Sequence, residues 1–255
     1  MLVDSHCHLN SLSERRIKAV IDEYKDNYIL IDSSIDFESS CASISLSRKF
    51  DFIYTALGFH PFSGDRFTDS ILGDYQNLIT ENHKVVAIGE VGLDYKADIS
   101  IDKQQSILEK FLDLAKKNTL PVFIHNRLKD ERILDILNSF FPNYERIVFH
   151  CFSYSTQFLN KIIAKQGNVS FSLNILRKNK KIISSLKNCP IKNMLLETDS
   201  PYMKIDNVCS SPLDIDQVYS FASLRRGIDK SDLELKVFNN IKKLFLTKTS
   251  HDEKP

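Results

Sequence analysis

The chain has 255 residues, of which 42% are hydrophobic and 26% are charged. This composition is typical of a soluble globular protein and too apolar for a disordered one. The 34 Lys and Arg residues nearly balance the 33 Asp and Glu residues, so the net charge of +1 gives no whole-molecule attraction for nucleic acid, and a polyanion would have to be bound locally.

Eight short segments rich in apolar and β-branched residues recur along the chain and predict strands. They cover residues 2–9, 28–34, 51–60, 85–94, 121–126, 146–152, 168–173 and 193–199. Charged segments with helical spacing lie between them; in the first, Ile17, Val20 and Tyr24 share one face. Residues 207–245 predict one or two further helices, and residues 246–255 predict a flexible polar tail.

Strands that alternate with helices indicate βαβ units around a parallel sheet. An open doubly wound sheet should carry a glycine-rich phosphate loop after its first strand, whereas this first segment ends in His6-Cys7-His8. Eight units without a linker instead predict one α/β domain over residues 1–255, a (β/α)8 TIM-type barrel. Its active site should lie at the C-terminal ends of the strands.

Six of the eight predicted strands end in side chains that ionise or bind metals. These are His6 and His8, His60, Glu90, His125, His150 and Asp199. In an extended strand His6 and His8 share one face, and Cys7 points to the other. A lone buried histidine is more often structural, but several on one rim need shared partners. Imidazoles with carboxylates suit Zn, Mn or similar ions and Mg more weakly, and their number fits two metals that share a carboxylate for hydrolysis.

Several motifs together resemble the TatD family of metal-dependent deoxyribonucleases, within the amidohydrolase-like barrels. They are VDSHCHL, GFHP, VAIGEVGLDY, PVFIHNR, FHCFS and LLETDSPY, in this order over residues 2–203. The resemblance implies two divalent ions, and it distributes the ligands between them. One ion would be held by His6, His8, Glu90 and Asp199, and the other by Glu90, His125 and His150, with Glu90 as the bridge. His60 and Arg127 would contact the substrate phosphate, for which the forked donors of arginine are suited.

The resemblance also implies an activity, 3′-to-5′ exonuclease cleavage of single-stranded DNA or RNA. A water activated by the two ions would attack the phosphorus, with Asp199 helping to take its proton. Glu197 is expected to contact a ligand rather than to be one. Two sets of residues are open to a substrate-binding or a purely structural interpretation. They are the aromatic residues Phe62, Tyr95, Phe152 and Tyr154 and the lysines Lys178, Lys180, Lys181 and Lys204.

Two other functions remain as alternatives. One is an amidohydrolase that cleaves an amide or ester bond, including aminoacyl-tRNA deacylation, although such relatives often carry a modified lysine where this chain has Glu90. The other is a non-catalytic metal- or nucleic-acid-binding barrel, which would require a broken ligand set. Two segments depart from the family pattern: KIDNVCSSPLD replaces an Arg-Asn-Glu-Pro turn, and SFSLNILRKNKK lacks a glycine after SFS. We expect both to affect the choice of substrate.

The remaining expectations concern location and partners. The sequence has no run of 18 apolar residues and no basic residue before Arg15, so we expect neither a membrane span nor a secretory signal. Five scattered cysteines without a CxxC pair suit reduced thiols in the cytoplasm. Single-stranded nucleic acid is the expected partner, and no obligate protein partner is evident.

Overall fold

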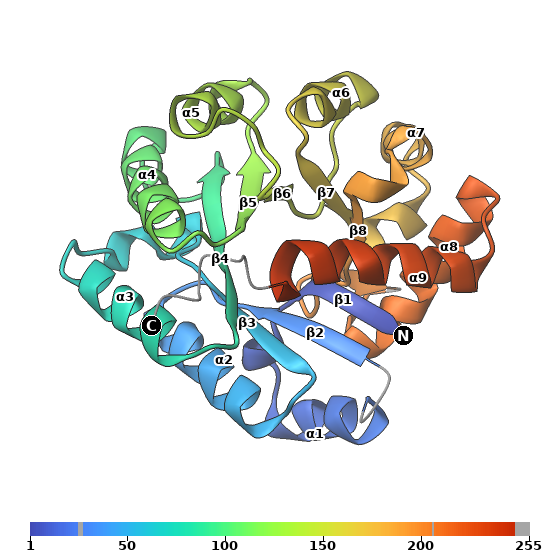
Figure 1. The fold of residues 1–255 in the computed structure, drawn as a ribbon, viewed down its shortest axis with the longest axis horizontal. Helices are drawn as coiled ribbons and strands as arrows, with labels where there is room; N and C mark the ends of the chain where they lie inside the picture. The colour runs from blue at the N-terminus through green and yellow to red at the C-terminus, as the bar shows by residue number, and fades with distance from the viewer. Residues whose placement is uncertain (25–27, 206, 248–255) are drawn as a thin grey trace.

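The computed structural model describes residues 1–24, 28–205 and 207–247, and an eight-stranded parallel sheet lies at its centre. The strands follow one another around the sheet in chain order (Figure 1). They are β1 Leu2–Cys7, β2 Tyr28–Ser33, β3 Ile53–Leu57, β4 Val85–Asp94, β5 Val122–Arg127, β6 Ile147–Phe149, β7 Asn168–Phe171 and β8 Met194–Leu196. The predicted strands and the (β/α)8 barrel are therefore confirmed. However, β1, β2, β3, β6, β7 and β8 end before their predicted last residues, so His8, His60, His150 and Asp199 lie just after their strands.

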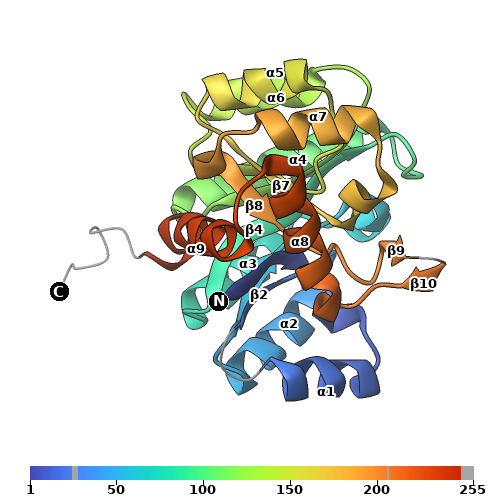
Figure 2. The same ribbon diagram turned by 90° about the vertical axis from the view of Figure 1, so that its right-hand side faces the viewer.

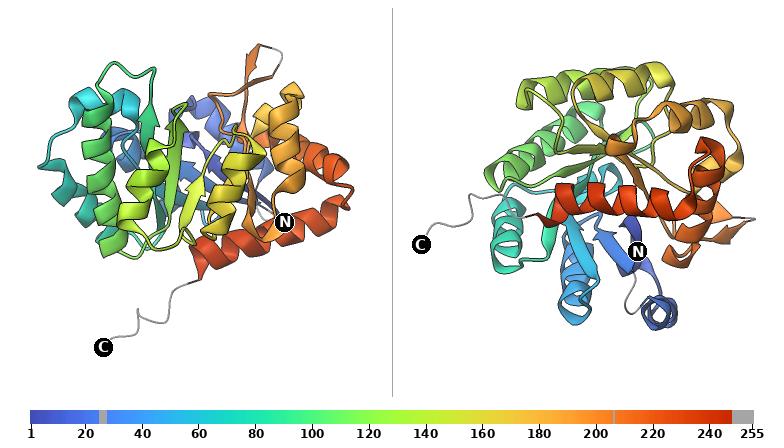
Figure 3. Two further views of the ribbon diagram at one scale, coloured as in Figure 1. Left: turned by 90° about the horizontal axis from the view of Figure 1, so that it is seen from above. Right: turned by 45° about the vertical axis from the view of Figure 1, so that its right-hand side comes forward.

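Most of the helices surround the sheet on its outside, and the last one crosses an end of the barrel (Figure 1). They are α1 Glu14–Glu23, α2 Phe37–Lys49, α3 Ile71–Glu81, α4 Ile101–Lys117, α5 Arg132–Phe140, α6 Thr156–Ala164, α7 Lys180–Asn188, α8 Ile215–Arg226 and α9 Lys230–Ile241. The clearest apolar stripe is that of α4, which buries Ile107, Leu108 and Phe111 among others. A small hairpin, β9 Lys204–Ile205 and β10 Val208–Cys209, projects at the end of the barrel opposite α9 (Figure 3).

The barrel closes between β8 and β1 through a few specific hydrogen bonds. The amide of Asp199 donates to the carbonyl of His6 over 3.0 Å, and the amide of His8 donates to the carbonyl of Ser200 over 2.7 Å. Below them, the amide of Thr198 donates to Asp4 Oδ1 over 2.9 Å. Because these bonds join the His6–His8 segment to Asp199, closure of the barrel also assembles part of the candidate site.

Aromatic rings fill the barrel beneath the histidines. Phe123 of β5 is fully buried, contacts the His6 ring at a centroid distance of 5.2 Å and stacks on Phe245 at 5.1 Å. Phe245 belongs to a π-helical segment, Lys242–Leu246, which follows α9 where that helix crosses the end of the barrel (Figures 2 and 3). Burying each of these rings contributes about 1.5–3 kcal/mol and removes water from below the site.

The C-terminal region agrees with the sequence prediction in its helices and differs at one residue of its tail. The predicted closing helices are α8 and α9. Residues 248–255 of the predicted tail lie outside the described residues, whereas Leu246 still ends the π-helical segment and packs partly buried against the core. Within the described ranges, no helix has the length and apolar character needed to cross a membrane.

Candidate metal centre

Glu90 lies at the middle of the site because β4 is irregular there. The pairing of β4 with β5 shifts register between Ile88 and Val91, and such a bulge re-aims the side chain that it contains. Gly92 follows, at a φ of 157°, and a Cβ atom there would stand 1.8 Å from the carbonyl oxygen of His125. The glycines beside Glu90 therefore allow β4 to approach the backbone of β5. Gly89 faces β5 as well, because a Cβ atom there would stand 2.6 Å from the Cβ of Phe123.

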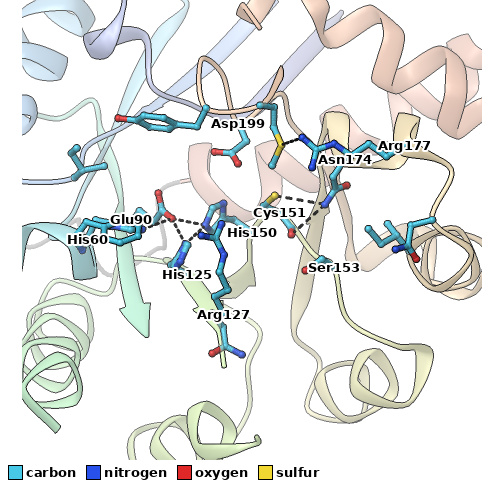
Figure 4. Close-up of a pocket in the computed structure, with 17 residues that line it drawn as sticks. His60, Glu90, His125, Arg127, His150, Cys151, Ser153, Asn174, Arg177 and Asp199 are labelled. Atoms are coloured by element: carbon cyan, nitrogen blue, oxygen red, sulfur yellow. Dashed lines mark hydrogen bonds and ion pairs between the residues drawn. The ribbon is translucent and has the colours of Figure 1, made fainter. Parts of the chain in front are cut away.

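Five imidazoles converge on the Glu90 carboxylate, which is buried at 3% exposure. Figure 4 shows three of them, those of His60, His125 and His150. The distances to Oε1 are 2.5 Å from His125 Nδ1, 2.6 Å from His150 Nε2 and 3.5 Å from His60 Nε2. The distances to Oε2 are 3.4 Å from His8 Nε2 and 3.6 Å from His6 Nε2. Asp199 joins the group from the loop after β8, with Oδ1 at 3.6 Å from His8 Nε2. All six predicted metal-binding residues are thus brought together.

The outer ring nitrogens of these histidines contact groups that fix the ring orientation. His8 Nδ1 donates to the carbonyl of Ser33 over 2.9 Å, and His125 Nε2 donates to Asp94 Oδ2 over 2.9 Å. His6 Nδ1 lies 3.0 Å from the hydroxyl of Ser33. In a neutral imidazole with one nitrogen donating outward, the other nitrogen carries a lone pair, and here that lone pair points inward. This is the arrangement that outer partners impose on metal-binding histidines.

His150 and Glu197 complete this pattern. His150 Nδ1 is buried without a hydrogen-bond partner in the described part of the chain and lies 3.7 Å from Glu197 Oε1. The Glu197 carboxylate accepts from the amide of Cys151 at 2.6 Å and from the hydroxyl of Ser170. Glu197 therefore faces the outer side of a proposed ligand, in the place where it was expected.

The donor set fits divalent cations. Three combinations of these residues place their ligand atoms within 4.8 Å of one another: His6, Glu90 and His150; His6, His8 and Asp199; and His60, Glu90 and His125. Every one of these side chains is buried. Imidazole nitrogens with carboxylate oxygens are the ligands that Zn, Mn and similar ions take. A cation would also compensate the charge of the buried carboxylates of Glu90 and Asp199.

The pKa values show that the carboxylates favour positive charge at three of the five histidines, whereas burial lowers the pKa values of His6 and His60. Burial alone would raise the pKa of Glu90, but the imidazoles of His150, His60 and His125 hold it well below its ordinary value. Burial would likewise lower the pKa of His8, yet its contacts with Asp199 and Glu90 raise it to about 10. The carboxylates also raise the pKa values of His125 and His150. Protons thus occupy the positions that metal ions would take, so metal binding must displace them.

His60 differs from the other histidines in its hydrogen bonding. Its Nδ1 accepts from the amide of Phe62 over 3.1 Å, and burial lowers its pKa to about 3. The ring is therefore neutral with its proton on Nε2, which faces Glu90 and the cavity. An N–H group directed into the cavity suits a donor to substrate better than a metal ligand.

Asp94, at the end of β4, is a residue that the sequence interpretation missed. One oxygen of its buried carboxylate, Oδ2, accepts a hydrogen bond from His125 Nε2 and also pairs with Arg127 Nη1 at 3.1 Å. It thereby joins a proposed metal ligand to a proposed phosphate-binding residue. The sequence did contain an indication of this role. Asp94 lies four residues after Glu90 in the same predicted strand, so the two side chains are expected on the same face of the sheet.

A cavity of about 820 Å³ lies above the cluster. His60, Glu90, His125, His150 and Asp199 line it, and Arg127 and Arg177 enter it from different sides (Figure 4). Arg177 and Asn174 come from the segment after β7 that lacks the family glycine, and sequence reasoning did not single them out.

The aromatic residues divide into two groups. Phe62 lines the cavity with 54% of its surface exposed, and Tyr95 is equally exposed. Stacking of Phe152 or Tyr154 on bases is wrong, because Phe152 is buried at 1% exposure and the hydroxyl of Tyr154 is bound to the carbonyls of Asn126 and Leu128. Tyr202, which was not considered, lines the cavity with 53% exposure and contacts the His8 ring edge-on at 4.7 Å.

The barrel and the converging buried ligands define the class of protein as a metal-dependent hydrolase. Comparison with known proteins agrees with this class. The family model described as TatD related DNase matches residues 3–246. The chain therefore belongs to the family of TatD related DNases, hydrolases of phosphodiester bonds.

Individual relatives match over nearly the whole chain. An uncharacterised metal-dependent hydrolase of Methanocaldococcus jannaschii is 28% identical over 250 residues, 95% of this chain and 96% of the relative. The 3′-5′ ssDNA/RNA exonuclease TatD of Erwinia tasmaniensis is 28% identical over 232 residues, 85% of this chain and 87% of that one. The crystal structure of the TatD homologue YjjV from Escherichia coli K12 matches with a TM-score of 0.88 and 25% identity, over 97% of this chain and 98% of that one.

Proposed function

We propose that this chain shortens single-stranded DNA or RNA from the 3′ end, one nucleotide at a time, with two divalent ions bound around Glu90. The convergence of buried imidazoles and carboxylates at the floor of an arginine-lined cavity carries this proposal. The substrate and the direction of cleavage rest on the Erwinia relative, which is named as a 3′-5′ ssDNA/RNA exonuclease.

The proposed ligands form two half-sites that meet at Glu90. His6, His8 and Asp199 would hold one ion, and His125 and His150 the other. Glu90 Oε1 faces His125 and His150, and Oε2 faces His8 and His6, so the Glu90 carboxylate could contribute to both half-sites. Mg, Mn and Zn are the candidate ions; the four nitrogen ligands favour Zn, whereas Mn and Mg prefer the carboxylate oxygens.

When bound, the two ions would lower the pKa of a water and stabilise the charge that develops on the phosphate. Asp199 is suited to accept the proton of the attacking water. Burial would raise its pKa, but the hydrogen bond from His8 and the nearby imidazoles lower it, so the carboxylate is ionised. As the water oxygen bonds to phosphorus and the bond to the leaving oxygen breaks, an Asp199 Oδ atom would accept the released proton, which then passes to the leaving oxygen.

Arg127 and His60 are proposed to bind the phosphate. The Arg127 side chain is 47% exposed at the cavity and held by Asp94, so its remaining N–H groups are free to contact phosphate oxygens. The Nε2–H of His60 would donate to another oxygen.

Free thiols at the exposed Cys41 and Cys209 support a cytoplasmic location, where thiols stay reduced.

The experiment uses the metal-stripped protein and a single-stranded oligonucleotide labelled at its 5′ end. Addition of Mg, Mn or Zn should produce a ladder of products shortened by one nucleotide at a time, and a matched duplex should be cleaved more slowly. A panel of amide and ester substrates, including an aminoacyl-tRNA, is tested in parallel. Cleavage confined to that panel would reject the nuclease proposal in favour of an amidohydrolase.

A further inference from the structure

A second hollow, of about 400 Å³, lies on the outside of the barrel over α7 and α8. Its lining consists of Lys178, Lys180, Ile183, Ser184, Lys187, Asn188 and Arg225. Four of these seven residues are cationic, and none of the lining residues that the structure describes is acidic. In a protein with a net charge of +1, this is a marked local concentration of positive charge.

The hollow and the active-site cavity share one wall. Arg177 and Asn179 line the cavity, whereas the alternate residues Lys178 and Lys180 line the hollow. The next turn repeats the division, since Ile182 faces the cavity and its neighbour Ile183 the hollow. The segment that leads into α7 is therefore a ridge with the candidate active site on one side and the basic hollow on the other.

The far side of the hollow is held in place by α8. The guanidinium of Arg226 donates to the carbonyls of Cys189 at 2.8 Å and Lys187 at 3.2 Å, and it also contacts the carbonyl of Leu186. These bonds attach the end of α7 to the end of α8, which are neighbours in Figure 1. Lys187 and Arg225 are thereby kept on one surface.

The charges of the hollow are not neutralised within the described part of the chain. Lys178, Lys180, Lys187 and Arg225 are exposed, and none of them lies within ion-pair distance of a described carboxylate. Lys187 and Arg225 stand in the last turns of their helices, where cations stabilise the helix dipole. Lys180 stands in the first turn of α7, which has no acidic residue, and a cation there is unfavourable. Helix stability alone therefore does not explain the set.

We infer that this basic hollow is a second binding site, which takes the phosphodiester backbone of the strand outside the active-site cavity. The inference rests on the proposed function. A strand whose 3′ end lies at Glu90 would leave the cavity past Arg177 and cross the ridge, and its phosphates would then meet the four cations. Short substrates would not reach the hollow, so it should increase affinity for long strands without changing the chemical step.

The test is direct binding of fluorescent oligothymidylates by anisotropy, in EDTA so that no cleavage occurs. A long probe of roughly 16 nucleotides is compared with a dinucleotide at several salt concentrations. The variant K180Q/K187Q/R225Q removes three cations from the hollow. The control K236Q/K242Q/K243Q removes three exposed lysines from α9 and the segment after it, at the opposite end of the barrel.

Each lost phosphate contact lowers the slope of log affinity against log salt by about 0.7, so the hollow variant should lower it by about 2 for the long probe. The dinucleotide and the control variant should bind as in the wild type. Equal binding of the long probe by wild type and hollow variant would overturn the inference, and so would equal weakening for both probes. The inference would also be overturned, in favour of a membrane surface, if the hollow variant bound the long probe as the wild type does but lost binding to phosphatidylserine vesicles. A wild type that binds the long probe through the hollow but cleaves no strand with any metal would reject the proposed function and leave the hollow as a nucleic-acid site.

Discussion

Replacement of Asp94 by Asn tests whether the buried carboxylate sets the orientation and proton position of His125. In the native site, Asp94 Oδ1 accepts from the amide of Lys96 at 2.9 Å, and Oδ2 accepts from His125 Nε2 and Arg127 Nη1. Asparagine has one oxygen, and the Lys96 amide requires it at the Oδ1 position. The NH2 group would then face two donors.

The repulsion can be relieved if His125 moves its proton from Nε2 to Nδ1. The Nδ1 atom lies 2.5 Å from Glu90 Oε1 and is the atom that would bind the metal, so the change removes its lone pair from the site. Loss of an outer partner of a metal-binding histidine typically costs about 10–100-fold in activity or metal affinity. A wrong imidazole tautomer in a hydrolytic site costs up to about 10⁴-fold. We therefore expect D94N to lower kcat/KM by about 10²–10⁴-fold.

The assay is kcat/KM on a single-stranded oligonucleotide across a metal titration, together with calorimetric metal binding and thermal unfolding of the metal-free protein. The matched control is D102N, because Asp102 also pairs with an arginine, Arg132, at 3.4 Å but is 92% exposed. Exposed pairs contribute little, so this variant should act like the wild type. A D94N protein with normal folding, metal affinity and kcat/KM would refute the tautomer argument.

Three further predictions concern the same centre. Because His125 Nδ1 is a proposed ligand, H125A should lower turnover by at least about 100-fold while circular dichroism shows an intact fold; wild-type rates would reject this ligand assignment. Cys7 is buried outside the metal-binding groups with its thiol near the carbonyl of Ile31, so C7S should leave metal affinity unchanged in calorimetry. Metal must displace the proton of His8, whose pKa is raised from 6.5 to about 10. Affinity measured by titration should therefore rise with pH between these values, by up to about tenfold per pH unit for each displaced proton, and a flat profile would contradict this charge state.

The sequence predicted the barrel and the metal-binding groups because both depend on short-range pattern. Alternating strands and helices determine the architecture, and ionisable residues at strand ends must meet at one rim of a barrel. The strand pattern placed His60 at that rim, but only the family resemblance gave it a substrate-binding role rather than that of a ligand. The distinction depends on the hydrogen bond from the amide of Phe62, which fixes the proton on Nε2.

Other features depend on contacts between distant segments. The single Asp94 oxygen is shared by His125 and Arg127 because Asp94 pairs with Arg127 in the register of β4 and β5, and the spacing of Asp94 from Glu90 alone does not show these partners. Phe152 follows a strand end as Phe62 does, yet it turns into the core against Phe171. The hollow combines residues of α7 with Arg225, and this combination follows from the packing of two helices.

The central claim is that Glu90 joins two metal ions that are needed for cleavage. Its most direct test is calorimetric titration of Mn or Zn into the metal-stripped wild type and the isosteric variant E90Q, with turnover of a single-stranded oligonucleotide measured on the same samples. We predict that the wild type binds two equivalents and gains activity as the second equivalent binds, whereas E90Q binds at most one tightly and is inactive. Two equivalents and wild-type turnover in E90Q would contradict the account.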